Sequence, residues 1–209
     1  MKMSDMGVLK SLVQRATTVV RADPVCDLSL GLRQQIWMSM GHERGLGPGH
    51  ARRMVLALET ARHVLPLWES KYLQDRTPHT ALDFAEEMRV ARCEKSEGQD
   101  LWQQAWNHMV ELSCSDEEDL RGVAAGFSAV QALCTCIEDE LFPLAEVDEK
   151  LRDNQVDAED MDASAFASAA CAGGPVWDVL SDSARRLQFW EWWLSEAVPN
   201  AYRLERTPR

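Results

Sequence analysis

The stretch Leu187-Gln188-Phe189-Trp190-Glu191-Trp192-Trp193-Leu194 decides how this chain folds, because it places three of the eight tryptophans within four residues. When successive residues are set about 100° apart around a helix axis, the apolar side chains of this region fall on an arc of roughly 180°. The arc is formed by Leu187, Phe189, Trp190, Trp193, Leu194, Ala197 and Val198. An arc of this width is typical of a helix buried in a helical core.

Trp192 is the one tryptophan of this stretch that lies off the arc. It falls between Gln188 and Glu196, on the polar side of the predicted helix. A tryptophan in that position either lies under a neighbouring segment or is an anchor for a binding partner, since tryptophan is enriched at binding hot spots. The pattern alone leaves both interpretations open.

The rest of the chain also shows helical periodicity, without convincing strand alternation. The pattern predicts an all-α, single-domain multi-helix bundle of about eight to nine helices, mostly with antiparallel neighbours because the connections are short. The expected helices cover residues 4–20, 28–40, 48–65 with a continuation towards 72, 77–91, 96–110, 115–141, 143–152, 158–171 and 187–199. The helix from residue 115 is rich in small residues, which predicts a central position.

Several helix boundaries have recognisable signals. Thr77 is expected as an N-cap with Pro78 in the first turn. Ser96–Gln99 and Ser115–Glu118 both have the spacing of a capping box. Pro66 removes a backbone hydrogen bond, so it should kink or restart its helix.

Residues 1–209 are expected to form one domain, with a flexible glycine-rich loop at 42–49 and a Gly-Gly-Pro break at 173–175. No apolar run approaches about 18 residues, so no membrane span is expected. The N-terminus lacks the apolar segment of a secretory signal, which predicts a cytoplasmic protein. The six cysteines are then expected as reduced thiols.

Recognisable catalytic and metal-binding patterns are missing from the sequence. It contains no HExxH, GxSxG or Walker motif, and no second cysteine or histidine pair stands at metal-ligand spacing beside Cys134 and Cys136. We therefore predict no catalytic residue, no metal and no cofactor, and do not expect an enzyme.

Acidic residues are concentrated in one part of the chain. Residues 111–182 hold 18 of the 34 acidic residues but only three of the 22 basic ones, within a total net charge of −12. Such a region repels nucleic acid and anionic membranes and attracts a basic protein, unless it only aids solubility. The candidate partner-binding residues are Asp116, Glu117, Glu118, Asp119, Glu138, Asp139, Glu140 and Trp192.

The segment from Arg62 to Pro78 resembles a motif of the all-α predicted immunity proteins of bacterial polymorphic toxin systems, immunity protein family five. The matching residues are Val64-Leu65-Pro66, Trp68-Glu69, Asp75-Arg76 and Pro78, with Thr77 as an insertion. The segment around Trp190 and Trp193 also resembles a C-terminal element of that family, and Ala124–Gly126 resembles its central small-residue helix. Phe127 stands where members often carry histidine, so the resemblance does not extend to a role for those histidines.

This resemblance implies a protein that binds and neutralises a cognate toxin. Together with the acidic charge, it makes a basic nuclease the expected type of toxin, and the charge predicts that the chain itself binds neither nucleic acid nor membrane. Asp75 and Arg76 are expected to form a structural ion pair and helix cap, with a functional loop patch as the alternative. Two other functions stay open: a helical adaptor for another protein, and a small-molecule site beside the tryptophans.

Overall fold

The computed structural model describes residues 4–41, 47–90, 94–115, 120–139 and 148–204. Within these residues the regular structure is entirely helical, which confirms the all-α bundle. The elements are α1 (Ser4–Ala22), α2 (Leu30–Ser39), α3 (Pro48–Glu69), α4 (Thr77–Arg89), α5 (Lys95–Ser115), α6 (Leu120–Ile137), the short turns η1 (Asp153–Gln155) and η2 (Ala158–Asp160), α7 (Ala163–Ala172), α8 (Ser183–Trp192), η3 (Trp193–Ala197) and α9 (Val198–Leu204).

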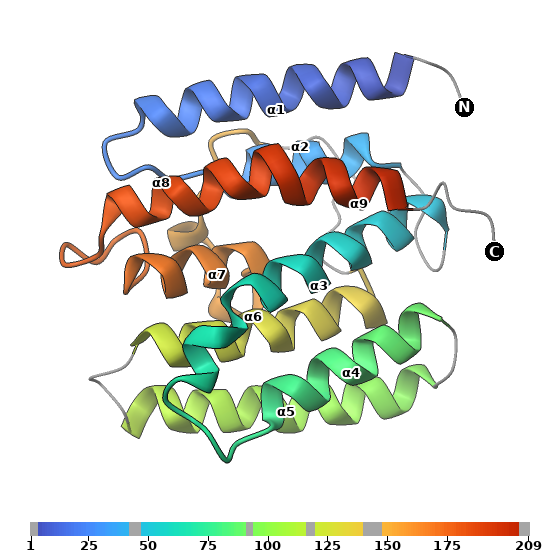
Figure 1. Cartoon of the computed structure of the whole chain (residues 1–209), viewed down its shortest axis with the longest axis vertical. Helices are drawn as coiled ribbons and strands as arrows, with labels where there is room; N and C mark the ends of the chain where they lie inside the picture. The colour runs from blue at the N-terminus through green and yellow to red at the C-terminus, as the bar shows by residue number, and fades with distance from the viewer. Residues whose placement is uncertain (1–3, 42–46, 91–93, 116–119, 140–147, 205–209) are drawn as a thin grey trace.

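Helix α6 lies at the centre of the bundle, as its small residues predict. It packs against α3, α4, α5 and α7, and α4, α5 and α6 run in alternating directions (Figure 1). By length and hydropathy alone α6 could cross a membrane, contrary to the expectation from the sequence, but 67% of its apolar window is buried inside the protein. Its apolar character therefore serves the core of the bundle.

The C-terminal helix is longer than predicted. Instead of ending at Pro199, it continues from α8 through the π-helical turn η3 into α9, which ends at Leu204. The Val198 N–H bonds to the carbonyl of Trp193, five residues back. A proline ring normally clashes with the carbonyl four residues earlier, and the wider π turn relieves this clash at Pro199.

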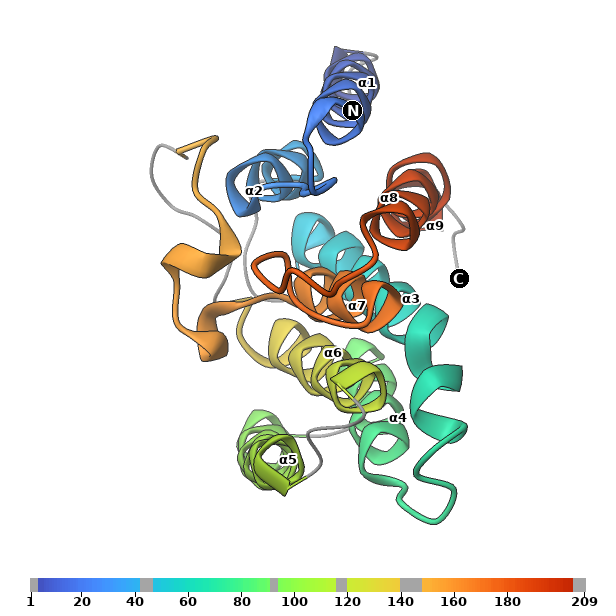
Figure 2. The same cartoon turned by 90° about the vertical axis from the view of Figure 1, so that its left-hand side faces the viewer.

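Other boundaries also differ from their sequence signals. Helix α3 continues through Pro66 to Glu69, and its last turns bend away from the initial axis (Figure 2). Arg76, not Thr77, is the N-cap residue of α4. Helix α5 begins at Lys95, so Ser96 lies inside it and forms no capping box. Most of the second predicted capping box and of the predicted loop at 42–49 lies outside the described residues.

The connection before α7 is irregular where the pattern predicts helix. Residues 148–152 form a turn and extended chain, and α7 begins only at Ala163. Asp162 is its N-cap and accepts hydrogen bonds from the backbone of Ser164 and Ala165. Gly173, with φ of 81°, ends α7 at the predicted Gly-Gly-Pro break.

Two buried arginines from the first half of the chain form ion pairs with acidic residues of its second half. These acidic residues lie in the segment before α7 and just after the end of α6. Arg33 on α2 is fully buried and forms ion pairs with Asp153, at 2.5 Å, and Asp162, at 2.6 Å. Arg53 on α3 pairs with Asp139 at 2.6 Å. Charged groups are buried only when they are paired, so these contacts fix α2 and α3 against the acidic region.

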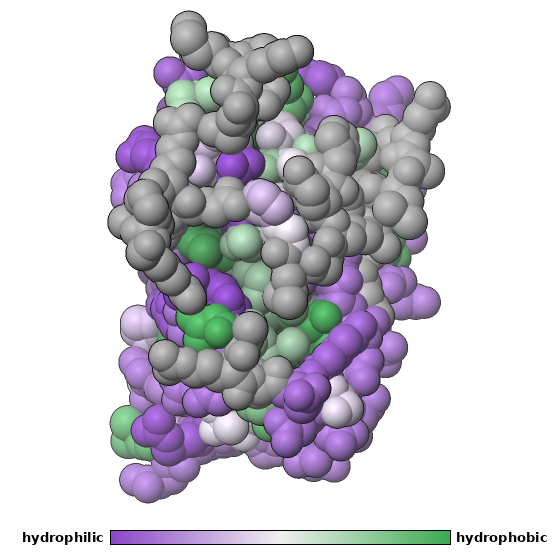
Figure 3. Space-filling model, turned by 90° about the vertical axis from the view of Figure 1, so that its right-hand side faces the viewer, coloured by the Kyte–Doolittle hydropathy of each residue, from purple (hydrophilic) through white to green (hydrophobic). Residues whose placement is uncertain are grey.

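Figure 3 shows the face at the right-hand side of Figure 1, where hydrophilic residues line the edges and apolar residues lie towards the middle.

Candidate partner-binding surface

Trp192 packs on a histidine from another helix. Its indole stacks on the imidazole of His63 in α3, with 3.6 Å between ring centroids and 13° between the planes. Phe189 lies beside both rings, 5.8 Å from Trp192. Trp192 is partly buried, so one face of its ring is covered by α3 while part of the side chain remains accessible.

Trp192 lines an open groove of about 430 Å³ between α3, α6, α7 and α8. The lining residues are His63, Val64, Pro66, Leu67, Arg121, Cys171, Arg185, Gln188, Phe189 and Trp192. A groove of this size accommodates a few side chains of a partner or a small ligand, since such sites typically span about 300–1,000 Å³.

The charges along this groove are positive. Arg121 donates hydrogen bonds to the carbonyls of Ala170, at 3.1 Å, and Cys171, at 3.4 Å, and Arg185 pairs with Asp182 at 3.4 Å. Burial lowers the pKa of His63, although the negative charge of Glu196 opposes this effect.

The groove offers no activated nucleophile among its described residues. Burial raises the pKa of the Cys171 thiol to about 11, so the thiol is protonated near neutral pH and is a poor nucleophile. The arrangement is suited to holding apolar or anionic groups of a partner rather than to covalent chemistry.

The family motif around Trp68 is a structural clamp. The Trp68 indole, completely buried, donates a hydrogen bond to the carbonyl of Asp75 at 3.0 Å. The Asp75 carboxylate accepts from the Thr77 N–H at 2.8 Å and from His108 Nε2 of α5 at 2.6 Å. Burial raises the pKa of Asp75, but the hydrogen bonds from His108 and Thr77 outweigh it and lower the pKa overall.

This geometry supports the structural interpretation of the motif, with a different partner from the predicted one. Arg76 is exposed, and the described residues include no ion pair between it and Asp75. His108 takes that place instead. Glu69 contacts His79 at 2.9 Å on the surface, and Pro78 is buried in the first turn of α4.

Trp190 and Trp193 are core residues, as the helical arc predicts. Both are buried, and their rings pack edge to face, 5.7 Å apart. Trp193 Nε1 donates to Thr60 Oγ1 at 3.0 Å, and Arg33 lies over the Trp190 ring. The cavity beside Trp193 holds only about 30 Å³, which is room for about one water molecule and too small for a metabolite.

The acidic candidates differ in their surroundings. Asp116, Glu117, Glu118, Asp119 and Glu140 lie outside the described residues. Glu138 is partly exposed and pairs with Lys95 at 2.8 Å. Asp139 is buried and held by Arg53, so we leave it out of the proposed binding surface.

With this geometry in place, the comparison with known proteins decides the family. A family model described as "Immunity protein Imm5" matches residues 13–200. The chain belongs to the Imm5 immunity protein family. An Imm5 protein has a cognate toxin as its partner, and both the Trp68 clamp and Trp192 lie inside the matched range. No curated protein sequence matches this Imm5 chain significantly.

Sequence reasoning missed three residues that the structure brings together around Trp192. His63 has the pattern of an ordinary helical histidine, and no motif singles out Arg121 or Arg185. The three come from different helices that are far apart in the sequence, so no local spacing connects them. The off-arc position of Trp192 was the only available signal.

Proposed function

We propose that this chain neutralises its toxin by binding it directly, with the acidic residues between 111 and 162 facing a basic, nuclease-type toxin domain. The supporting observation is the separation of charge along the chain, in which residues 111–182 hold 18 acidic residues against three basic ones. Asp157, Glu159 and Asp160 of this region are exposed, whereas Asp153 and Asp162 point inward to Arg33.

Attraction between opposite charges increases the association rate of such a complex. An acidic surface increases the encounter rate with a basic partner and repels nucleic acid, the partner's proposed substrate. The bound immunity protein would then cover the toxin's basic surface in the cytoplasm of the producing cell. This action requires occlusion only, and no chemistry by the immunity protein.

Trp192, which lies outside the acidic region, is proposed as a separate apolar anchor. It combines a fixed ring, held by His63, with an adjacent groove that can receive side chains of the toxin. Aromatic side chains in partly formed pockets are common binding hot spots. Glu138, just after α6, is a partly exposed member of the acidic region and lies away from the Trp192 groove.

The first experiment is co-expression with the toxin domain encoded beside this gene, scored by rescue of growth and by co-purification. Rescue with a stable complex supports immunity by direct binding. Absence of both, with toxicity demonstrated, overturns the proposal and favours the adaptor or ligand-binding alternatives.

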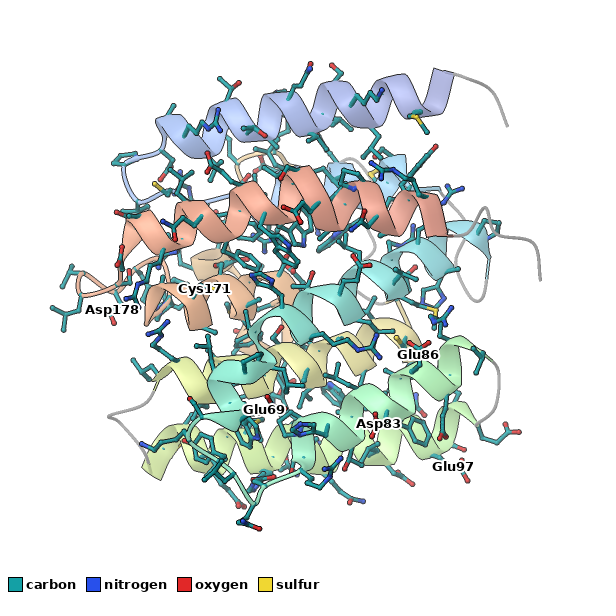
Figure 4. The ribbon with its side chains drawn as sticks, in the orientation of Figure 1. Glu69, Asp83, Glu86, Glu97, Cys171 and Asp178 are labelled. Atoms are coloured by element: carbon teal, nitrogen blue, oxygen red, sulfur yellow. The ribbon has the colours of Figure 1, made fainter. Side chains whose placement is uncertain are left out.

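Charge reversal then tests the acidic region. Replacing Asp116, Glu117, Glu118 and Asp119 by lysine should weaken binding and flatten its dependence on salt concentration. The matched control reverses four acidic residues outside the region, namely Glu69, Asp83, Glu87 and Glu97, which are exposed on α3, α4 and α5. Figure 4 shows three of these four, Glu69, Asp83 and Glu97. Equal losses in both variants would mean that only total charge matters.

A further inference from the structure

The loop between α7 and α8 exposes three apolar side chains within four residues. Val179 is 94% exposed, Leu180 is 89% exposed and Trp177 is 51% exposed. We call residues 177–180 the apolar loop, and Figure 4 shows its remaining residue, Asp178, at the outer end of the molecule. Single exposed apolar residues are ordinary, but a group of them on a protruding loop marks an interaction site.

The apolar loop is held in one conformation by its own polar atoms. Asp178 Oδ1 accepts from the Leu180 N–H at 2.9 Å, and the Asp178 carbonyl accepts from the Ser181 hydroxyl at 2.7 Å. The Asp178 side chain lies so close to Gly174 that a Cβ there would be 2.6 Å from Oδ2. A side chain at position 174 would therefore displace the Asp178 carboxylate from its present position.

Arg186 holds the two residues that bracket the loop, Gly174 before it and Ser181 after it. It is almost fully buried, and its guanidinium donates to the carbonyls of Val25, at 3.0 Å, and Gly174, at 2.9 Å, and to Ser181 Oγ, at 2.9 Å. Among the described residues, no carboxylate forms an ion pair with it, and burial lowers its pKa. Burying a cation in this way is costly, and what it achieves here is a fixed position for the loop.

We propose that the apolar loop is an anchor that this chain inserts into an apolar pocket, rimmed by basic residues, on its toxin. This inference rests on the proposed function and adds the contact point. Charge complementarity supports it, because Asp178 stands among the apolar side chains and the loop belongs to the stretch 111–182, in which acidic residues predominate. Asp182, two residues after the loop, is paired with Arg185. An apolar centre with a polar rim is the usual anatomy of a protein interface.

Two further features suit the loop to this role. Its fixed conformation means that little conformational entropy is lost on binding. Arg185, which pairs with Asp182 at the end of the loop, also lines the groove beside Trp192. The apolar loop therefore lies close to that groove, so that a toxin bound at the loop would also lie close to the Trp192 ring.

The test measures the affinity of a catalytically inactivated toxin domain for the wild-type chain and for the double variant Val179→Ser/Leu180→Ser. The expected loss is at least about 30-fold, as for interface hot spots. Both side chains are exposed, so the thermal unfolding midpoint should stay unchanged. The control is Leu73→Ser, an equally polar change at an 80% exposed leucine in the loop between α3 and α4, and its affinity should stay within about twofold of wild type.

Three results would contradict the inference, and they are distinguishable. Undiminished binding by the double variant overturns the apolar loop as an anchor and leaves the proposed function standing. Failure of the wild-type chain to bind overturns the proposed function and this inference with it. If the double variant does not fold, hydrogen exchange of the wild-type chain decides: the amides of residues 177–182 should be protected in the complex, and unchanged exchange there overturns the inference.

Discussion

Trp192 covers the imidazole of His63 almost in parallel, with 3.6 Å between the two ring centroids. This contact joins α8 to α3 across the groove and explains why a tryptophan stands on the otherwise polar side of its helix. The stack removes one face of each ring from water. The pKa of His63 therefore reports whether the Trp192 ring covers it.

Removing the indole should therefore change the titration of His63. In the Trp192→Ala variant we expect the pKa of His63 to rise towards its ordinary value of 6.5, because burial is what lowers it. In the wild type, native His63 binds protons less readily than unfolded His63. The free energy of unfolding therefore rises as the pH rises from the lowered pKa of native His63 to the ordinary value of 6.5, and it falls again as the pH is lowered through this range. This pH dependence should be weaker in the variant.

The measurement is an NMR titration of the histidine ring protons, with chemical denaturation at several pH values. Trp177→Ala is the control, because Trp177 lies in the loop between α7 and α8 and the described ring contacts of His63 do not include it. A pKa for His63 that does not move in Trp192→Ala would refute the assigned cause.

A methyl group at Gly126 should destabilise the protein, although Gly126 lies within a helix. A Cβ there would overlap the Sδ of Met109 and would lie 3.0 Å from two ring atoms of Trp68. Alanine is favoured over glycine in helices by about 1 kcal/mol, but overpacking of a core costs about 1–3 kcal/mol. Gly126→Ala should therefore lower the free energy of unfolding by about 1 kcal/mol.

The same substitution at Gly7 provides the matched control. Gly7 lies in α1, and no atom of a neighbouring side chain lies within 4 Å of the point that a Cβ would occupy. Gly7→Ala should therefore raise the free energy of unfolding by up to about 1 kcal/mol. Urea denaturation of both variants gives the comparison. Changes of the same sign would show that packing against Met109 and Trp68 does not decide the outcome at Gly126.

Apolar periodicity predicts the core well, because burial and periodicity have the same cause. Phe189, Trp190, Trp193 and Leu194 share one predicted arc, and all four are buried. The central position of α6 follows in the same way from its small side chains. The extension past Pro199 could not be predicted, since a π turn has no counterpart in the spacing of apolar residues.

Ion pairs between distant residues were also beyond local reasoning. Asp139 stands in an acidic run that is typical of a solvated surface, yet it is buried against Arg53, 86 residues away in sequence. His108 replaces Arg76 as the partner of Asp75 for the same reason. Local patterns identify the acidic region and Trp192, but only the folded chain shows which of these side chains are already engaged.

The hydrogen bonds of the Asp75 carboxylate with Thr77 and His108 should stabilise the fold only while the carboxylate is ionised. Its pKa is lowered, so the contribution is complete above the ordinary value of 3.8 and is lost as the pH falls through the lowered pKa. Asp75→Asn should lower the free energy of unfolding by about 1–2 kcal/mol at pH 7. Denaturation at pH 7 and pH 3 should show a smaller difference from wild type at pH 3, and Asp83→Asn, at an exposed position of α4, should change little.

Asp153 and Asp162, the two buried carboxylates beside Arg33, should destabilise the protein at high pH once the arginine is removed. Arg33→Met leaves Asp153 and Asp162 buried without their cation, which should cost about 3–5 kcal/mol at pH 8. Burial raises the pKa of Asp153, and Arg33 opposes this in the wild type. In the variant the native state therefore binds protons more readily than the unfolded state, so the loss should be smaller at pH 5.

Arg21→Met, which breaks an exposed pair with Glu191, should cost no more than about 0.5 kcal/mol at either pH. A loss in Arg33→Met that does not depend on pH would mean that the two carboxylates find other partners or water.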